Sequence, residues 1–173
     1  MKFLHAADLH LDRSFEGLTS VPEHFQERLI TANQKMLKNI VDTAITQAVD
    51  FVLLVGDTFH QNRPTLKTQR YFFQEMDRLA EAAIPVFMNF GNHDFYQADR
   101  YWFAFPENIQ LFDEERVETK KLVTNSGEKI AITSFSYLHP TIEALMIEQF
   151  PRKEDVDFHI GMYHGGQMPY APF

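Results

Sequence analysis

Cysteine is absent from all 173 residues of the chain. Neither a disulfide framework nor a thiolate zinc site can therefore form, and any metal must be held by His, Asp, Glu, Asn or water. Basic residues are also scarce, since 16 Lys and Arg face 24 Asp and Glu for a formal net charge of −8. Proteins that bind nucleic acid mainly by neutralising phosphates carry a basic patch, so this charge argues against DNA binding. Two divalent ions at one spot would reverse that argument locally, because they add about four positive charges.

Long apolar segments are also missing. No stretch of the sequence is apolar for long enough to span a bilayer, and the N-terminus has no signal-peptide pattern, so we expect a cytoplasmic protein without membrane contact. Glycine and proline are few, at 7 and 8, whereas 17 Phe and a 45% hydrophobic content indicate a well-filled interior rather than disorder. The length suits one domain spanning residues 1–173.

Short apolar runs alternate with helical patterns along the first half of the chain. Strands are predicted at residues 3–7, 51–55 and 85–90, and helices at 25–48, with Pro22 in the first turn, and at 65–83, before Pro85. Strand, helix, strand implies right-handed crossovers and parallel pairing. The first half is therefore expected to be an α/β unit.

The rhythm changes after Gly91. Residues 108–112, 117–123 and 129–137 are predicted as consecutive strands, with a turn at Asn125-Ser126-Gly127 between the last two, and 158–163 as a further strand. A chain that is α/β first and more antiparallel later predicts two packed sheets flanked by helices, a layered α/β sandwich.

Polar residues fall at the ends of four predicted strands. Asp8 and His10 follow the first, Asp57 the second, Asn92-His93-Asp94 the third, and His164 the strand at 158–163. Loops at the carboxyl ends of parallel strands converge on one crevice, so these side chains are expected to meet. Asp8 and His10, two apart in an extended segment, should share one face roughly 7 Å apart, with Leu9 pointing into the core.

Two glycines directly precede these residues. Gly56 and Gly91 mark positions where a tight turn or a close approach to a metal would exclude a Cβ atom. The mixed carboxylate, imidazole and amide set suits Mn²⁺, with Fe²⁺ or Zn²⁺ as possibilities, better than Ca²⁺.

Other polar and aromatic residues have competing interpretations. His5, within the first strand, is expected to be buried and hydrogen-bonded, whereas His60, three residues after Asp57, is expected to touch substrate. Arginines near the motifs could bind phosphate oxygens or simply be solvated; they are Arg13, Arg63 and Arg100. The aromatic run 101–105 is expected in the core or an interface, although base stacking is an alternative.

The motifs together resemble the calcineurin-like metallophosphoesterase superfamily. They are Asp8-Leu9-His10, Gly56-Asp57, Gly91-Asn92-His93-Asp94 and Met162-Tyr163-His164-Gly165. Taken singly, Asp-Leu-His and Gly-Asp are common, so the order of the set carries the resemblance. The opening residues 3–11 and the segment 56–60 are similar to the double-strand-break repair exonucleases, nuclease subunits that partner a coiled-coil ABC-type ATPase, and most of all to the SbcD-type, Gram-positive branch.

That resemblance implies an α/β/β/α sandwich and a two-metal phosphodiesterase acting on DNA. It implies that Asp57 bridges two ions, that Asp8 and His10 complete one, and that Asn92 and His164 complete the other. His93 would stabilise the transition state or protonate the leaving oxygen, and His60 would orient the scissile phosphate; His60 is the residue that favours a nuclease over a phosphatase.

One departure from the family pattern leaves alternatives open. The family continues with a Gly-x-His-x-His element that this sequence does not contain, so we expect these residues to be the N-terminal part of a longer sandwich. The alternatives are a small-molecule phosphatase or phosphodiesterase of the same superfamily, and an inactive dimerisation module. By resemblance, a homodimer would pair through helices at 65–83 and 97–105.

Overall fold

The computed structural model describes residues 1–13, 23–152 and 155–166, and the side chains of 23–30 are not among those described. In chain order the elements are β1 Phe3–Ala7, α1 Glu23–Thr46, β2 Phe51–Val55, α2 Leu66–Glu81, β3 Val86–Asn89, η1 Ala98–Arg100, β4 Ile109–Phe112, β5 Glu118–Val123, β6 Lys129–Ser134, η2 Met146–Gln149 and β7 Phe158–Gly161. The predicted helices and strands are thus found within a few residues of their expected bounds, except for the region 97–105; Pro22 lies outside the described residues.

The first sheet has the order β1-β2-β3-β4, and every neighbouring pair is parallel. Parallel pairing of β1, β2 and β3 is therefore confirmed. β4 also runs parallel to β3, so the change towards antiparallel structure comes one strand later than the sequence suggested. The long connection 90–108 explains this, because a parallel neighbour needs a crossover of a dozen or more residues.

The second sheet has the order β5-β6-β7. β5 and β6 form the predicted antiparallel hairpin, and Gly127 takes a φ of 86° in its turn. β7 then pairs with β6 in parallel, so the later half of the chain is only partly antiparallel.

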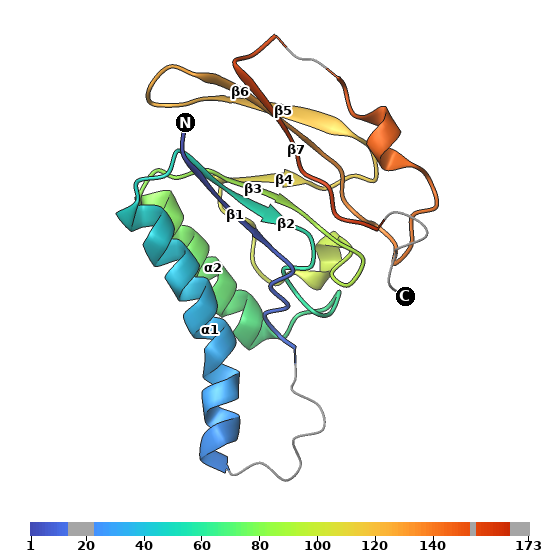
Figure 1. The fold of residues 1–173 in the computed structure, drawn as a ribbon. Coiled ribbons are helices and arrows are strands. Elements are labelled where there is room, and N and C mark those ends of the chain that lie inside the picture. Colours follow the sequence, from blue (N-terminus) through green and yellow to red (C-terminus); the bar gives the residue numbers. More distant parts are fainter. Residues whose placement is uncertain (14–22, 153–154, 167–173) are drawn as a thin grey trace.

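The sheets and helices form layers (Figure 1). α1 and α2 cover one face of the first sheet, and the second sheet lies against the other face. β2 shows why its apolar run is continuous: Val52 and Leu54 join the core on the helix side, whereas Phe51, Leu53 and Val55 join the core between the sheets. The described residues supply three layers of the expected sandwich, and no α-helix among them covers the outer face of the second sheet.

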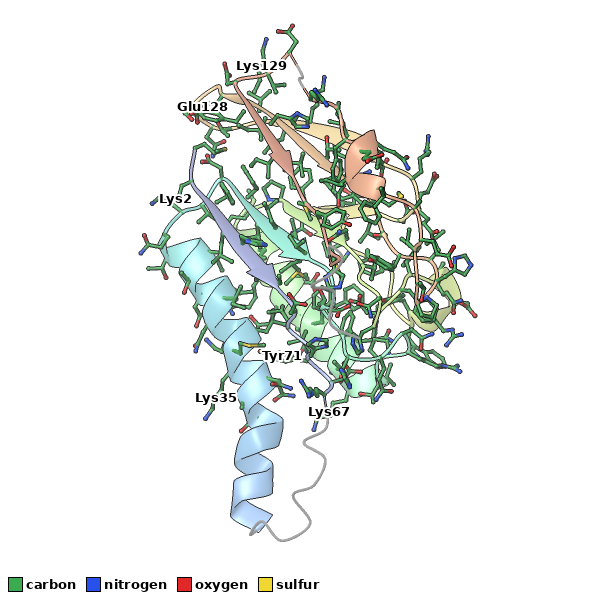
Figure 2. All side chains as sticks on the ribbon, turned by 45° about the vertical axis from the view of Figure 1, so that its right-hand side comes forward. Lys2, Lys35, Lys67, Tyr71, Glu128 and Lys129 are labelled. Carbon is green, nitrogen blue, oxygen red and sulfur yellow. The ribbon has the colours of Figure 1, made fainter. Side chains whose placement is uncertain are left out.

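Local contacts fix the two helices against each other. α2 begins where the Thr65 hydroxyl accepts a hydrogen bond from the Thr68 N–H, a standard N-cap. Arg78 of α2 pairs with Asp42 of α1 and with Glu75 of its own helix. Tyr71 of α2, labelled in Figure 2, donates its hydroxyl hydrogen to the backbone carbonyl of Gln34 in α1.

The segment 97–105 does not form the helix expected there. Only Ala98–Arg100 is helical, as a short 3₁₀ turn, and Tyr101 is extended. Aromatic packing opposes the helix that the resemblance implied, because the ring of Tyr101 packs against Phe59, Phe90 and Phe105. No helix among the described residues is long and apolar enough to cross a membrane.

Candidate metal centre

The carboxyl ends of β1, β2 and β3 meet at one edge of the first sheet, as the sequence predicted. Backbone hydrogen bonds join the loop after β1 to the loop after β2: the N–H groups of Asp8 and His10 donate to the carbonyls of Gly56 and Asp57, at 3.2 and 3.0 Å. His164, which follows β7 in the second sheet, reaches the same place. Four loops far apart in the sequence therefore deliver side chains to one site.

Three residues of the site have left-handed backbones. The φ angles of Asp8, His10 and Asp57 are 53°, 45° and 46°. The expectation that Asp8 and His10 lie in an extended segment is therefore wrong, because the chain turns sharply as soon as β1 ends. Such conformations cost of order 1–3 kcal/mol each and persist only where the surroundings impose them, which is common at functional sites.

Asp57 lies at the centre of the site. Its side chain is only 4% exposed, and one carboxylate oxygen, Oδ2, is 3.8 Å from His10 Nε2 and 3.5 Å from His164 Nε2. The other oxygen, Oδ1, accepts a hydrogen bond from the His93 backbone N–H at 3.0 Å. One carboxylate oxygen of Asp57 therefore lies within 4 Å of two imidazole rings.

Asp8, Asp57 and His164 form one cluster of potential metal ligands, the Asp57 group. Ligand atoms of Asp8, Asp57 and His164 all lie within 4.8 Å of one another, and Asn92 Oδ1 is 3.1 Å from His164 Nε2. Asp8 is 3.9 Å from His164 and its side chain is 60% exposed, so it can turn freely. Asp8 thus lies nearer to His164 than the expected pairing with His10 implies.

His10 belongs to a second group. One ring nitrogen from each of His10, His60 and His93 lies within 4.8 Å of those of the other two. His10 Nδ1 is 3.3 Å from His60 Nδ1, and the rings of His60 and His93 stack with their centroids 5.0 Å apart. Burial lowers the pKa of His10, which favours its neutral, ligating form.

Gly56 and Gly91 leave room for these side chains. A Cβ on Gly91 would lie 2.2 Å from Asp57 Oδ1 and 2.8 Å from His164 Nε2, and one on Gly56 would lie 2.2 Å from the His164 ring. These distances are well inside van der Waals contact, so both glycines are required by close approach, as predicted. Gly56 also has a φ of 62°, which favours glycine.

Two buried residues that the sequence analysis gave no role hold the loops in place. Asp94, fully buried, accepts hydrogen bonds from the backbone N–H groups of Asp57, Phe59 and Gly91. Burial raises the pKa of Asp94 to about 7, although the backbone N–H groups that it accepts from act to lower it. Asn89 accepts from the Gly56 N–H and donates to the Phe135 carbonyl, which links the two sheets. Asp94 could have been singled out, since it ends the Gly91-Asn92-His93-Asp94 motif.

A cavity of about 710 Å³ is lined in part by the Asp57 group. Its lining includes all five proposed metal ligands, Asp8, His10, Asp57, Asn92 and His164, together with His93. The lining also includes Tyr137, Pro140, Thr141, Ile142 and Tyr163, which the sequence alone gave no reason to single out. His5 also lines the cavity and is exposed, so the expectation of a buried His5 is wrong.

The other predicted substrate contacts lie outside that lining. His60 touches the site through His10 and His93 rather than through the cavity. Arg13 and Arg63 are exposed, and Arg100 faces Asp99 at 3.8 Å; none of the three is among the residues that line the cavity. Their part in substrate binding stays a prediction.

Comparison with known proteins decides the family. The profile described as "Calcineurin-like phosphoesterase" matches residues 1–171. The chain belongs to the calcineurin-like phosphoesterases. The sequence-based assignment is therefore confirmed, and with it the α/β fold class.

Curated members of this family are similar to the chain at moderate identity. An uncharacterized metallophosphoesterase of Bacillus subtilis, YhaO, is 34% identical over 179 residues, covering 100% of the chain and 44% of that protein. The DNA double-strand break repair protein Mre11 of Sulfurisphaera tokodaii is 29% identical, covering 99% and 42%. A subunit of the nuclease SbcCD of Bacillus subtilis is 27% identical, covering 79% and 34%. The chain spans less than half the length of these relatives.

The residues at the phosphoesterase site fit the two divalent ions that this family binds. The donor set combines two carboxylates, an amide oxygen and imidazoles, which suits a first-row divalent metal. Two glycines keep the space around Asp57 free of Cβ atoms. No lysine or arginine is among the described residues lining the cavity, so the carboxylates there have no cationic side chain to neutralise them.

Proposed function

We propose that this chain is a divalent-metal-dependent phosphodiesterase, and that its substrate is DNA, cleaved as a repair nuclease cleaves it. The observation that carries the proposal is the position of Asp57, one of whose carboxylate oxygens lies within 4 Å of both His10 and His164 in the lining of a large cavity. Similarity to relatives named as Mre11 and as part of the nuclease SbcCD supports DNA as the substrate.

Five residues would hold two ions. Asp57 would bridge them, Asp8 and His10 would complete one, and Asn92 and His164 the other. The 3.1 Å approach of Asn92 to His164 supports their sharing an ion. The pairing of Asp8 with His10 requires the exposed Asp8 side chain to turn away from His164, to which it is now 3.9 Å distant.

When bound, the two ions would stabilise the charge that develops on the phosphate and lower the pKa of the attacking water. We propose manganese, with iron or zinc as alternatives, because the ligands mix oxygen and nitrogen donors. The chain's own contribution is to fix the distance between the ligands, through Asp94 and Asn89, which hold the loops after β2 and β3.

His93 would act on the leaving group. Its backbone is hydrogen-bonded to Asp57 and its exposed side chain lines the cavity, so its imidazole can reach a phosphate held beside Asp57. There it would protonate the leaving oxygen or stabilise the charge on the phosphate. His60 stacks on His93 and would set its orientation, and through it the position of the scissile phosphate.

A substrate panel tests the proposal. Linear duplex DNA, an aryl phosphodiester and an aryl phosphomonoester are each incubated with the protein and Mn²⁺, and with the His60→Gln and His139→Gln variants. We expect cleavage of both diesters, loss of DNA cleavage in His60→Gln, and no change in His139→Gln, whose side chain is 74% exposed.

Two results would contradict the proposal. Rapid hydrolysis of the monoester with intact DNA would instead identify a small-molecule phosphatase. Absence of both bound manganese and turnover would identify an inactive module whose value is an interface. The three arginines, Arg13, Arg63 and Arg100, are proposed as DNA contacts, and DNA binding by their alanine variants tests them separately.

A protein partner is also part of the proposal. The SbcD-type resemblance suggests a coiled-coil ABC-type ATPase partner and a cytoplasmic location, where such a complex would meet DNA. Co-purification of this chain with that ATPase tests the association.

An interface between two copies has a specific observation behind it. Leu66, at the start of α2, is 54% exposed, and Trp102 and Phe103 are 71% and 38% exposed. Trp102 is tied to α2, because its backbone N–H donates to Gln69 Oε1 at 2.9 Å. Residues 65–83 and 97–105 therefore expose three large apolar side chains, which supports a homodimer interface there.

Solution mass tests this interface. Trp102→Glu should convert a dimer to a monomer, whereas Leu145→Glu, at a residue 66% exposed elsewhere, should not. A wild-type protein that stays monomeric at high concentration would refute the dimer.

A further inference from the structure

The three histidines beside the Asp57 group form a compact cluster of their own. His10, His60 and His93 come from the loops after β1, β2 and β3, and their ligand nitrogens all lie within 4.8 Å of one another. All three ligands are imidazoles, and the cluster contains no carboxylate. The group therefore offers three imidazole lone pairs in one place, outside the Asp8, Asp57 and His164 group.

The spacing of these nitrogens suits one zinc ion. Tetrahedral Zn²⁺ with Zn–N bonds of about 2.0–2.1 Å holds two imidazole nitrogens about 3.3 Å apart. His10 Nδ1 and His60 Nδ1 are 3.3 Å apart. A ring nitrogen of His93 lies within 4.8 Å of one ring nitrogen of each of the other two histidines, and a turn of this exposed side chain would bring it to the distance that zinc requires.

The second nitrogen of His10 supports the same arrangement. His10 Nε2 lies 3.8 Å from Asp57 Oδ2, so a ring bound to zinc through Nδ1 would direct its Nε2–H towards a carboxylate. Zinc-binding histidines usually have such a partner, which fixes the tautomer and makes the ring a better ligand.

We propose that His10, His60 and His93 form an inhibitory zinc site, completed by water, that excludes the ion bound by His10 and Asp57. A neutral imidazole has one lone pair to give. When Nδ1 of His10 binds zinc, Nε2 carries the hydrogen and cannot bind an ion beside Asp57. In the pair without zinc, one of the two facing Nδ1 atoms carries the hydrogen that the other accepts. That hydrogen moves to Nε2 of the same ring when zinc binds, so the rings stay neutral.

Zinc in this site would withdraw three residues from the phosphodiesterase reaction at once. His10 would leave the metal pair, and His60 and His93 would be unable to act on the phosphate. The effect on turnover rests on the proposed function, but zinc binding does not, so binding and activity can fail separately.

The test measures zinc and manganese binding directly. Zinc is titrated into the protein with and without saturating Mn²⁺, and the bound metals are counted by native mass spectrometry. Nitrogen-15 NMR of the imidazoles reports which ring nitrogen carries zinc. We expect the His10 Nδ1 signal to shift, and zinc to displace one of the bound manganese ions.

Matched variants distinguish the two groups. His60→Gln should weaken zinc binding at least about tenfold and leave manganese binding unchanged, since a zinc ligand is lost while the Asp57 group is intact. His93→Gln should repeat that loss, and His139→Gln should show none. Asp8→Asn should do the reverse, weakening manganese and sparing zinc. Melting curves of each variant confirm that it is folded.

Three results would overturn the proposal. Equal zinc affinity in wild type and His60→Gln would remove the histidine site. A loss of zinc in Asp8→Asn as large as that in His60→Gln would place zinc among the carboxylates. Simultaneous binding of zinc and a full complement of manganese would refute the exclusion through His10.

Discussion

Replacing Gly91 with alanine is the most direct test of the site's geometry. The added Cβ would lie 2.2 Å from Asp57 Oδ1, 2.8 Å from the Asp57 backbone N and 2.8 Å from His164 Nε2. The φ of Gly91 is not in the left-handed region, so the alanine backbone itself is unstrained. The effect should therefore come from the contact alone.

The size of the displacement sets the expected loss. Ordinary contact begins near 3.4 Å, so Asp57 Oδ1 must move by about 1.2 Å. Metal–ligand distances in working sites hold to about 0.2 Å, so manganese affinity should fall by at least about tenfold. Overpacking of a buried site typically costs about 1–3 kcal/mol, which for a chain of this length corresponds to roughly 2–12 °C in the melting temperature.

The control is Gly161→Ala, at a glycine of β7 whose added Cβ would meet nothing within 4 Å. Both variants are melted in EDTA and in Mn²⁺, and manganese binding is measured by electron paramagnetic resonance. If Gly91→Ala has the same melting temperature as Gly161→Ala and the manganese affinity of the wild type, close packing around Asp57 does not shape the site.

Three further predictions follow from the same geometry. Asp57→Ala should lose manganese and activity together, whereas His93→Ala should keep manganese and lose rate by about 10²–10⁴-fold; loss of metal in His93→Ala would show that it is a ligand. Saturating the protein with Mn²⁺ at about 100 times Kd should stabilise it by about 2.7 kcal/mol, seen as a higher melting temperature that EDTA reverses. Asp94 has its pKa raised by burial from 3.8 to about 7, so between these values the folded carboxyl keeps a proton that the unfolded chain releases. Stability should therefore fall as pH rises, by about 1 kcal/mol between pH 5 and 6 in EDTA, relative to Asp94→Asn. The free energy of unfolding of both proteins is measured by urea denaturation at each pH. An equal change between pH 5 and 6 in wild type and Asp94→Asn would contradict that pKa.

Much of the fold could be predicted from local sequence. The runs at β2 and β3 and the helical spacing of α2 give their element types, because side-chain periodicity depends only on neighbours along the chain. Thr65 and Pro85 mark where α2 begins and ends for equally local reasons. The convergence of Asp8, Asp57 and Asn92 also followed from the sequence, since parallel strands end at one edge.

Other features depend on contacts between distant residues. β4 is parallel because 90–108 crosses back over the sheet, and 101–105 is irregular because Tyr101 packs among aromatic rings of other elements. No local pattern encodes either partner. The sequence therefore overestimated antiparallel pairing, and the family resemblance implied a helix at residues whose packing prevents it.

The chain alone supplied the residues of the site, but only the tertiary structure decided how they are grouped. The sharp turn at Asp8 and His10 sends Asp8 towards His164 and His10 towards His60 and His93. That turn is held by backbone hydrogen bonds to the loop after β2, across more than forty residues of sequence. Spacing along the chain limits which side chains can share an ion, whereas their orientation is set by hydrogen bonds and packing that form only when the strands are side by side.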